Sequence, residues 1–182
     1  GQVDQSILDA CLVCHSTREM QRGPVLDGLP EWYLAGQLRE FKLGRRGNNP
    51  ANRAGVLMGA AMAKVETEAQ FTTLARHFAA LKPKQFIRVI RGDIATGRAH
   101  YATRCASCHG ARGEGKREIE SPPVNVQEDW FLLDQLRKYA NGQRGVHPSN
   151  AGGLMMKAAA AALSPDDLRN IVAYIAKDLT VT

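Results

Sequence analysis

The sequence predicts an all-α protein that consists of two similar small domains in tandem. From Trp32 onward, residues of the first half recur in the second half at a constant offset of 98. Each half also carries one copy of the motif C-x-x-C-H and ends in a segment with a clear helix start signal. The chain has 182 residues, which is enough for two domains of about ninety residues each.

The motif C-x-x-C-H occupies residues 11–15 and 105–109, and the two copies contain all four cysteines of the chain. This spacing is typical of covalent attachment of haem c. Two thiols add across the vinyl groups of the porphyrin, and the adjacent histidine lies under the iron. The sequence therefore predicts two covalently bound haem c groups, each with its iron.

Other uses of paired cysteines explain the pattern less well. A redox dithiol needs no histidine directly after its second cysteine, and a structural zinc site is usually dominated by thiolates. One four-cysteine zinc site or a disulfide framework would leave the histidine after both pairs unexplained. We therefore favour haem c over these alternatives.

The internal repeat indicates duplication with one insertion. The two motifs are 94 residues apart, whereas the later matches are 98 apart, so the second half has four extra residues between His109 and Trp130. We expect this insertion in a loop near residues 113–123. The matched pairs include Trp32 and Trp130, Gln37 and Gln135, Arg46 and Arg144, Asn52 and Asn150, Gly55 and Gly153, and Met58 and Met156.

The repeat also selects candidate methionine ligands. A thioether opposite the histidine is a soft ligand that favours ferrous iron. Of the five methionines, Met58 and Met156 alone occupy equivalent positions in both halves. Met62 and Met155 are expected to be apolar filling, and Met20 is expected in a loop.

Helix start signals are strongest near the end of each half. Ser164 and Pro165 predict an N-cap followed by a first-turn proline, with the helix continuing to about Asp178. In the first half, Thr67 with Gln70 three residues later predicts a capping box.

Two further pairs of helices are expected. Middle helices should begin near Trp32 and Trp130, the second with Asp129 as its cap, and end near Gly44 and Gly142. An opening helix over residues 92–108 should deliver the second motif and place Tyr101 against Tyr174, whereas the first half has only a short helix before its motif. We expect domains at residues 1–85 and 92–182, joined by a linker at 86–91 that lies against a domain.

These features together resemble class I cytochrome c domains. Each half has C-x-x-C-H after an opening helix, a proline before a middle helix, a candidate methionine and a closing helix. Two such domains in tandem resemble the two-haem cytochrome c4 family over nearly the whole chain. The resemblance implies thioether bonds, proximal histidines, distal methionines, and a proline carbonyl that holds each histidine ring. These roles fall on Cys11, Cys14, His15, Met58 and Pro24, and on Cys105, Cys108, His109, Met156 and Pro122 or Pro123.

Composition limits the classes of partner. The formal charge is +6. Two haems, each with two propionates and a core that is +1 when ferric and neutral when ferrous, would reduce it to about +4 when oxidised and about +2 when reduced. The basic residues are scattered, so we expect no nucleic acid. No run of about twenty apolar residues could span a bilayer. Covalent haem attachment takes place outside the energy-transducing membrane, so we expect an exported, periplasmic protein.

We expect an electron carrier and not an enzyme. Single electrons would pass from a quinol-oxidising complex or a dehydrogenase to a terminal oxidase or reductase, with Arg45, Arg46 and Arg144 as candidate docking contacts. One alternative is a haem subunit or domain of a larger oxidoreductase. A less favoured alternative is a dihaem enzyme of the peroxidase or sulfur-compound dehydrogenase type, because a methionine in both distal positions would oppose catalysis. Three other histidines, His77, His100 and His147, are expected at the surface or in polar contacts, and His147 lies nearest in sequence to Met156.

Overall fold

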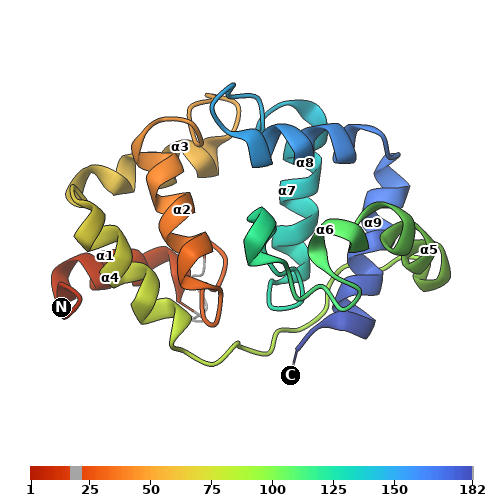
Figure 1. Ribbon diagram of the computed structural model, residues 1–182, viewed down its shortest axis with the longest axis horizontal. Helices are drawn as coiled ribbons and strands as arrows, with labels where there is room; N and C mark the ends of the chain where they lie inside the picture. The colour runs from red at the N-terminus through yellow and green to blue at the C-terminus, as the bar shows by residue number, and fades with distance from the viewer. Residues whose placement is uncertain (17–21, 182) are drawn as a thin grey trace. The chain divides into compact units, whose positions relative to one another are not determined.

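The computed structural model describes residues 1–16 and 22–181 of the chain, and Met20 lies outside them. It divides into two compact units, Gly1–Lys84 and Gln85–Thr182. The described residues form helices and a single isolated β-bridge, so the all-α class is confirmed. Each unit is a small helical fold with its own apolar core (Figure 1).

The first unit contains α1 (Gln5–His15), α2 (Glu31–Lys42), α3 (Arg53–Ala61), a 3₁₀ turn at Met62–Lys64 and α4 (Glu68–Ala79). Helix α2 packs along α4, and α1 contributes Ile7 to the same core as Phe71 and Leu74 of α4. The capping box predicted at Thr67 is present: Gln70 N donates to Thr67 Oγ1, and the Gln70 side chain accepts from Thr67 N.

The second unit contains more helices, and Asp93, Asn150 and Ser164 cap the N-termini of three of them with their side chains. It contains α5 (Ile94–Arg104), α6 (Ala106–His109), a 3₁₀ turn at Arg117–Ile119, α7 (Asp129–Asn141), α8 (Ala151–Ala161), α9 (Pro165–Tyr174) and a π-helical turn at Ile175–Leu179. The predicted Ser164 cap and first-turn Pro165 are both found at α9. The turn carries the closing helix to Leu179, close to the predicted end at Asp178.

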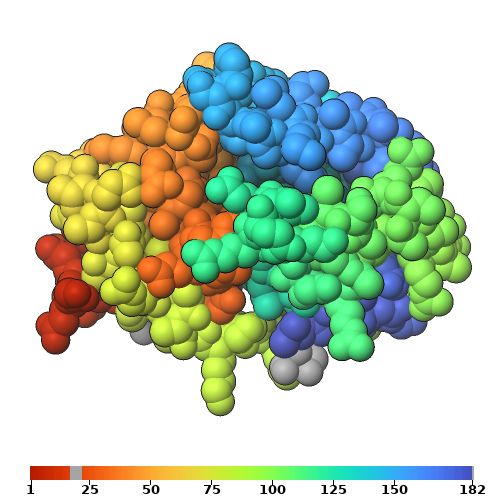
Figure 2. Space-filling model, in the orientation of Figure 1, coloured from red at the N-terminus to blue at the C-terminus, as the bar shows by residue number. Residues whose placement is uncertain are grey.

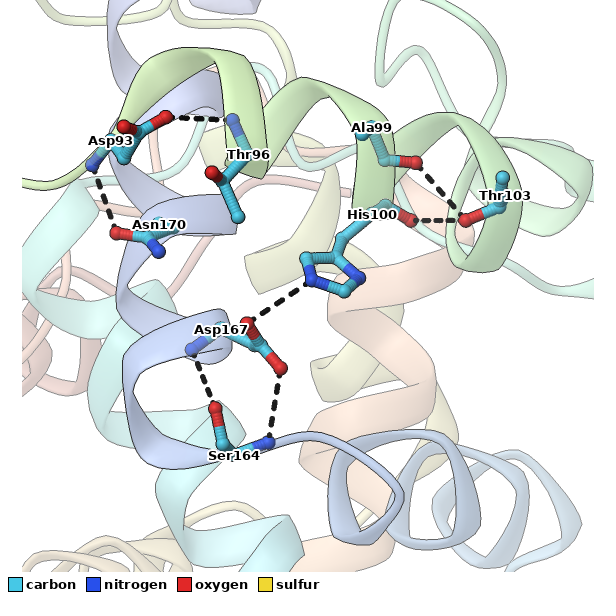
Figure 3. Close-up of polar contacts among 8 residues, drawn as sticks. All are labelled: Asp93, Thr96, Ala99, His100, Thr103, Ser164, Asp167 and Asn170. Carbon is cyan, nitrogen blue, oxygen red and sulfur yellow. Dashed lines mark hydrogen bonds and ion pairs between the residues drawn. The ribbon is translucent and has the colours of Figure 1, made fainter.

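Helix α5 crosses α9, and this crossing holds the opening and closing helices of the second unit together (Figure 3). The predicted contact between Tyr101 and Tyr174 is present, with ring centroids 5.6 Å apart. At the ends of the crossing, Asp93 N donates to Asn170 Oδ1 and His100 Nε2 lies 3.1 Å from Asp167 Oδ1. The carboxylate of Asp167 also accepts from the main-chain amide of its own cap, Ser164.

Two expectations about helix ends are wrong in detail. The opening helix of the second unit ends at Arg104, because the φ of −117° at Cys105 is far from the usual helical value, and a separate turn, α6, follows. Helix α7 begins at Asp129, with Glu128 as its cap residue. Asp129 is fully buried, and its Oδ2 accepts the amides of Val89 and Ile90 at 2.7 and 2.9 Å. These bonds tie residues 89 and 90 to the second unit.

Candidate haem-binding sites

The first C-x-x-C-H motif forms the last turn of α1. Cys11, Cys14 and His15 are three and four residues apart, so the helix presents them on one side. Both thiols are free and half-buried. Burial raises the pKa of the Cys11 thiol, which keeps it protonated and makes it a poor redox nucleophile.

His15 is held in one orientation by the chain that follows the motif. Its Nδ1 lies 2.7 Å from the carbonyl oxygen of Pro24, and the amides of Arg22 and Gly23 both donate to the Cys14 carbonyl. A proton on Nδ1 donated to a carbonyl leaves Nε2 as the nitrogen with a lone pair, which is the form that binds iron.

The second motif bridges two helices. Cys105 caps α5, and α6 carries Cys108 and His109, whose amides donate to the Cys105 carbonyl at 3.2 and 2.9 Å. Burial raises the pKa of Cys105 to about 11, so this thiol lacks the depressed pKa of a redox-active cysteine. The described cysteines form no disulfide, and no group of three or more His, Cys, Asp and Glu side chains in the described ranges could hold a metal ion.

His109 repeats the arrangement of His15 with one addition. Its Nδ1 lies 2.7 Å from the carbonyl oxygen of Pro122, the first of the two prolines that the sequence left open. The hydroxyl of Ser121 lies 3.2 Å from the same nitrogen. Burial lowers the pKa of His109, which favours the neutral imidazole that a metal requires.

The candidate methionines lie at matching places on α3 and α8. Both helices begin at an asparagine cap whose side chain accepts the amide of a glycine three residues later. Met58 is half-buried against the core cluster that also contacts Cys11. Met156 is half-buried against a cluster that shares Leu132 and Leu163 with the cluster around Cys105. In each unit, connected apolar packing therefore links the methionine to the first cysteine.

The other methionines differ in environment. Met62 is buried in the first core, as expected of apolar filling. Met155 is 66% exposed, so the expectation that it fills a core is wrong. Helix α8 lies at the surface, as the blue segment in Figure 2 shows, and on this helix Met155 is exposed whereas Met156 packs against the second core.

A second set of matched contacts fixes the loop before each methionine helix. Arg144 Nη1 donates to Gln135 Oε1 at 2.7 Å, and its guanidinium lies 4.6 Å from the centre of the Tyr139 ring. In the first unit the same contacts, at 2.7 and 4.5 Å, join Arg46 with Gln37 and Phe41. The repeat marked these positions, but the sequence did not show their role, which is to hold each loop on its middle helix.

This result corrects one of the proposed docking contacts. Arg144 is buried, so it is not a contact for a partner protein. Arg46 contacts Gln37 and Phe41, and Arg45 forms an ion pair with Glu40 at 2.8 Å, but both side chains are partly exposed and their part in docking stays a prediction.

The remaining histidines have protein contacts of their own. His77 packs edge-on against Phe78, and His100 pairs with Asp167. His147 accepts the amide of Ser149 at its Nδ1, within the turn before α8. These contacts agree with the expectation of polar or surface roles.

The donor set fits haem c. Each unit brings together two free thiols, an imidazole with one nitrogen fixed on a carbonyl, and a half-buried thioether near the same core. Thiols of this spacing bind the porphyrin, and imidazole and thioether are ligands of low-spin haem iron.

Across the described residues, no helix is long and apolar enough to cross a membrane.

Comparison with known proteins supports this assignment. Residues 94–177 match the cytochrome c family. The chain is 32% identical over 157 residues to a thiosulfate dehydrogenase electron acceptor from Thiomonas intermedia, covering 76% of this chain and 66% of that protein. It is 25% identical to cytochrome c4 from Azotobacter vinelandii, covering 96% of this chain and 86% of that protein.

Solved structures show the same fold. Cytochrome c4 from Acidithiobacillus ferrooxidans superposes with a TM-score of 0.73 at 23% identity, over 92% of this chain and 98% of that chain. A thiosulfate dehydrogenase from Marichromatium purpuratum gives a TM-score of 0.69 at 27% identity, over 92% of this chain but 36% of that chain. With two C-x-x-C-H motifs and two helical units, the chain is a cytochrome c4-like dihaem cytochrome that carries two covalent haem c groups and functions in electron transfer.

Proposed function

We propose that the protein is a periplasmic carrier that passes single electrons between respiratory partners through two His/Met-ligated haems. The observation that carries this proposal is the matched geometry of the two units. In both, a histidine ring is fixed on a proline carbonyl at 2.7 Å, and a methionine lies six residues after an asparagine cap.

The proposed roles follow the positions of the side chains. Cys11 and Cys14 bind the first porphyrin, and Cys105 and Cys108 bind the second. The iron ligands are His15 with Met58, and His109 with Met156. The Nδ1–H of each histidine donates a hydrogen bond to the carbonyl oxygen of Pro24 or Pro122, which fixes the ring and makes its Nε2 a stronger ligand for the metal.

The chemistry of the haem is reversible one-electron transfer at iron. The chain would exclude water from each porphyrin, would supply a histidine and a methionine to each iron, and would limit rearrangement on reduction. An iron held by both of these side chains would leave no position for a substrate, which favours a carrier over an enzyme. Covalent haem attachment outside the energy-transducing membrane supports the periplasmic assignment.

A second candidate function is to accept electrons from a thiosulfate dehydrogenase. Its support is the 32% identical relative with that name, together with the likeness to part of a larger thiosulfate dehydrogenase chain. In this case the donor is a dehydrogenase and not a quinol-oxidising complex, and the chain acts as a haem subunit or domain of an oxidoreductase system. The electron chemistry within the chain is the same.

Absorption spectra of the purified holoprotein, with a haem count and exposure to carbon monoxide, test the ligand proposal. We expect two haems per chain, low-spin spectra, a ferric sulfur-to-iron charge-transfer band and no binding of carbon monoxide. Met156→Ala should lose half of that band and open one iron, whereas Met155→Ala, on the exposed neighbouring residue, should change neither. Met58→Ala should behave like Met156→Ala, with Leu57→Ala as its control. An unchanged spectrum in either methionine variant would show that the assigned ligand is wrong.

Reduction assays separate the candidate donors. If the second candidate is correct, thiosulfate together with a thiosulfate dehydrogenase should reduce both haems of the oxidised protein at a rate proportional to the enzyme concentration. Thiosulfate alone should not reduce them, and reduction by thiosulfate alone would favour an enzyme. Rapid reduction by a quinol-oxidising complex, without a response to the dehydrogenase, would favour the first candidate.

A further inference from the structure

The two units differ at the residue that precedes the histidine-binding proline. At the repeat offset of 98, Ser121 of the second unit corresponds to Gly23 of the first. Ser121 is buried, and its hydroxyl oxygen lies 3.2 Å from His109 Nδ1. Gly23 has no side chain, so the first unit has no hydroxyl at this position.

The first unit has no room for a side chain at this place. A Cβ atom built on Gly23 would lie 2.8 Å from Cε1 and 2.9 Å from Nδ1 of the His15 ring. Real Cβ atoms essentially never approach other heavy atoms so closely. The main chain at Gly23 therefore lies directly against the His15 ring. In the second unit the main chain lies farther from the His109 ring, so that a serine side chain fits between them.

The four-residue insertion of the second half positions this serine. The amide of Lys116 donates to the Ser121 carbonyl at 2.8 Å, and the amide of Ser121 donates to the Lys116 carbonyl at 3.0 Å. Between them the chain turns through Arg117–Ile119 and through Glu120, which has a left-handed φ of 54°. Lys116 Nζ also donates to the carbonyl of Ser107 inside the haem motif at 2.7 Å. The inserted loop is thus pinned to the motif on one side and to Ser121 on the other.

The hydroxyl changes the hydrogen bonding of the histidine ring. When Nε2 of His109 binds iron, Nδ1 carries the ring proton and can only donate. Its proton is then shared between the Pro122 carbonyl at 2.7 Å and the Ser121 hydroxyl oxygen at 3.2 Å. A second acceptor draws the proton further from the ring and increases the electron donation of the imidazole to iron, which stabilises ferric iron.

We propose that Ser121 is a positioning residue that lowers the reduction potential of the second haem through the His109 ring. The equivalent position of the first unit is Gly23, which has no side chain and no room for one. The inference rests on the proposed ligation of the second iron by His109. It gives the inserted loop a function, since the loop presents one hydroxyl to one nitrogen.

Redox titration of the holoprotein, followed by absorbance, tests the proposal with Ser121→Ala. Removal of a weak second acceptor should shift the ferric-to-ferrous ratio of the second haem about threefold toward ferrous, which corresponds to a midpoint rise of about 28 mV. The midpoint of the first haem should not move. Met156→Ala identifies which of the two midpoints belongs to the second haem. Ser121→Thr, which keeps the hydroxyl, should restore the wild-type value.

A measurement on the wild-type protein provides an independent test that needs no variant to fold. In the diamagnetic ferrous state, the ring Nδ1 proton of His109 should show a nuclear Overhauser contact to the β protons of Ser121, and that of His15 should show one to the α protons of Gly23. Absence of the Ser121 contact would overturn the proposal. So would an unchanged or lowered midpoint of the second haem in Ser121→Ala.

Failure of this inference is distinguishable from failure of the proposed function. If His109 did not bind iron, the wild-type spectrum would already lack the signature of two low-spin His/Met haems. If the wild-type spectrum is as expected and Ser121→Ala moves neither midpoint, ligation stands and the role of Ser121 is refuted. A purely structural role of Ser121 would change thermal stability without changing the potential.

Discussion

Replacement of Asp129 by alanine should destabilise the second unit more than any change at the equivalent position of the first. The Asp129 carboxylate is fully buried and accepts three amides, from Val89 at 2.7 Å, Ile90 at 2.9 Å and Trp130 at 2.8 Å. Alanine removes all three bonds and leaves amides without acceptors next to the start of α7.

The expected cost follows from the kind of hydrogen bond that is lost. A bond to a charged acceptor contributes about 1.5–3 kcal/mol, and a donor that water can reach recovers part of this. Val89 is 58% exposed, so water can reach part of residues 89 and 90, and the lower end of the range applies. The bonds from Val89 and Ile90, at about 1.5 kcal/mol each, together contribute about 3 kcal/mol. We therefore expect Asp129→Ala to lower the free energy of unfolding by at least about 3 kcal/mol.

The duplicated unit supplies a matched control. Glu31 corresponds to Asp129 at the offset of 98, but it is partly exposed and pairs with Arg76 at 3.4 Å. A surface pair of this kind contributes about 0.2–1 kcal/mol. Glu31→Ala should therefore cost less than about 1 kcal/mol.

Urea denaturation of the two holoprotein variants, followed by circular dichroism, measures both costs. Hydrogen exchange adds local information, since the amides of Val89 and Ile90 should lose protection in Asp129→Ala and keep it in Glu31→Ala. Equal costs for the two variants, or retained protection of both amides in Asp129→Ala, would refute the reasoning.

Three further predictions concern helix packing, backbone strain and pH. Gly97→Ala should destabilise the protein by about 1–3 kcal/mol in urea denaturation, because the added Cβ would overlap the main-chain oxygen of Asn170. Glu120→Gly should stabilise it by roughly 0.5 kcal/mol in the same assay, because glycine tolerates the φ of 54°. Hydrogen bonds from Ser164, aided by His100, lower the pKa of Asp167 below its ordinary value of 3.8. The stability advantage of wild type over Asp167→Asn should therefore be complete above about pH 4 and disappear as pH falls through the lowered pKa, as thermal unfolding at a series of pH values would show.

Each of these predictions has a control and a contrary result. Gly36→Ala, in a helix with no neighbouring atom within 4 Å of the added Cβ, should stabilise by about 0.5–1 kcal/mol. Glu118→Gly, in the adjacent 3₁₀ turn, should not stabilise. Equal effects of the two alanine variants, equal effects of the two glycine variants, or a pH-independent difference for Asp167→Asn would contradict the corresponding argument.

Features specified by nearby residues were predictable from the sequence. The caps at Thr67 and Ser164 need partners three residues away, and both are found. The contact of Tyr101 with Tyr174 was also predictable, because the opening and closing helices both carried recognisable patterns.

Features specified by distant partners were missed. Asp129 is of a residue type that often caps helices. Instead, its carboxylate accepts hydrogen bonds from the amides of Val89 and Ile90, about forty residues earlier in the chain. The break at Cys105 depends on backbone geometry that no residue type there announces. Arg144 looked like a surface charge because the sequence does not show that Gln135 and Tyr139 enclose it.

The duplication separates what the two units need in common from what distinguishes them. On the methionine side, the distances within the asparagine caps and the arginine contacts agree between the two units to within 0.2 Å. On the histidine side, one unit places Gly23 and the other Ser121 beside the ring, and the inserted loop lies here as well. If both irons have one histidine and one methionine ligand, the two haems can differ in reduction potential through the contacts of those ligands. Such a difference should therefore come from the histidine side. Exchange of residues around Met58 and Met156 should then change both potentials alike, whereas a change at Ser121 should alter one alone.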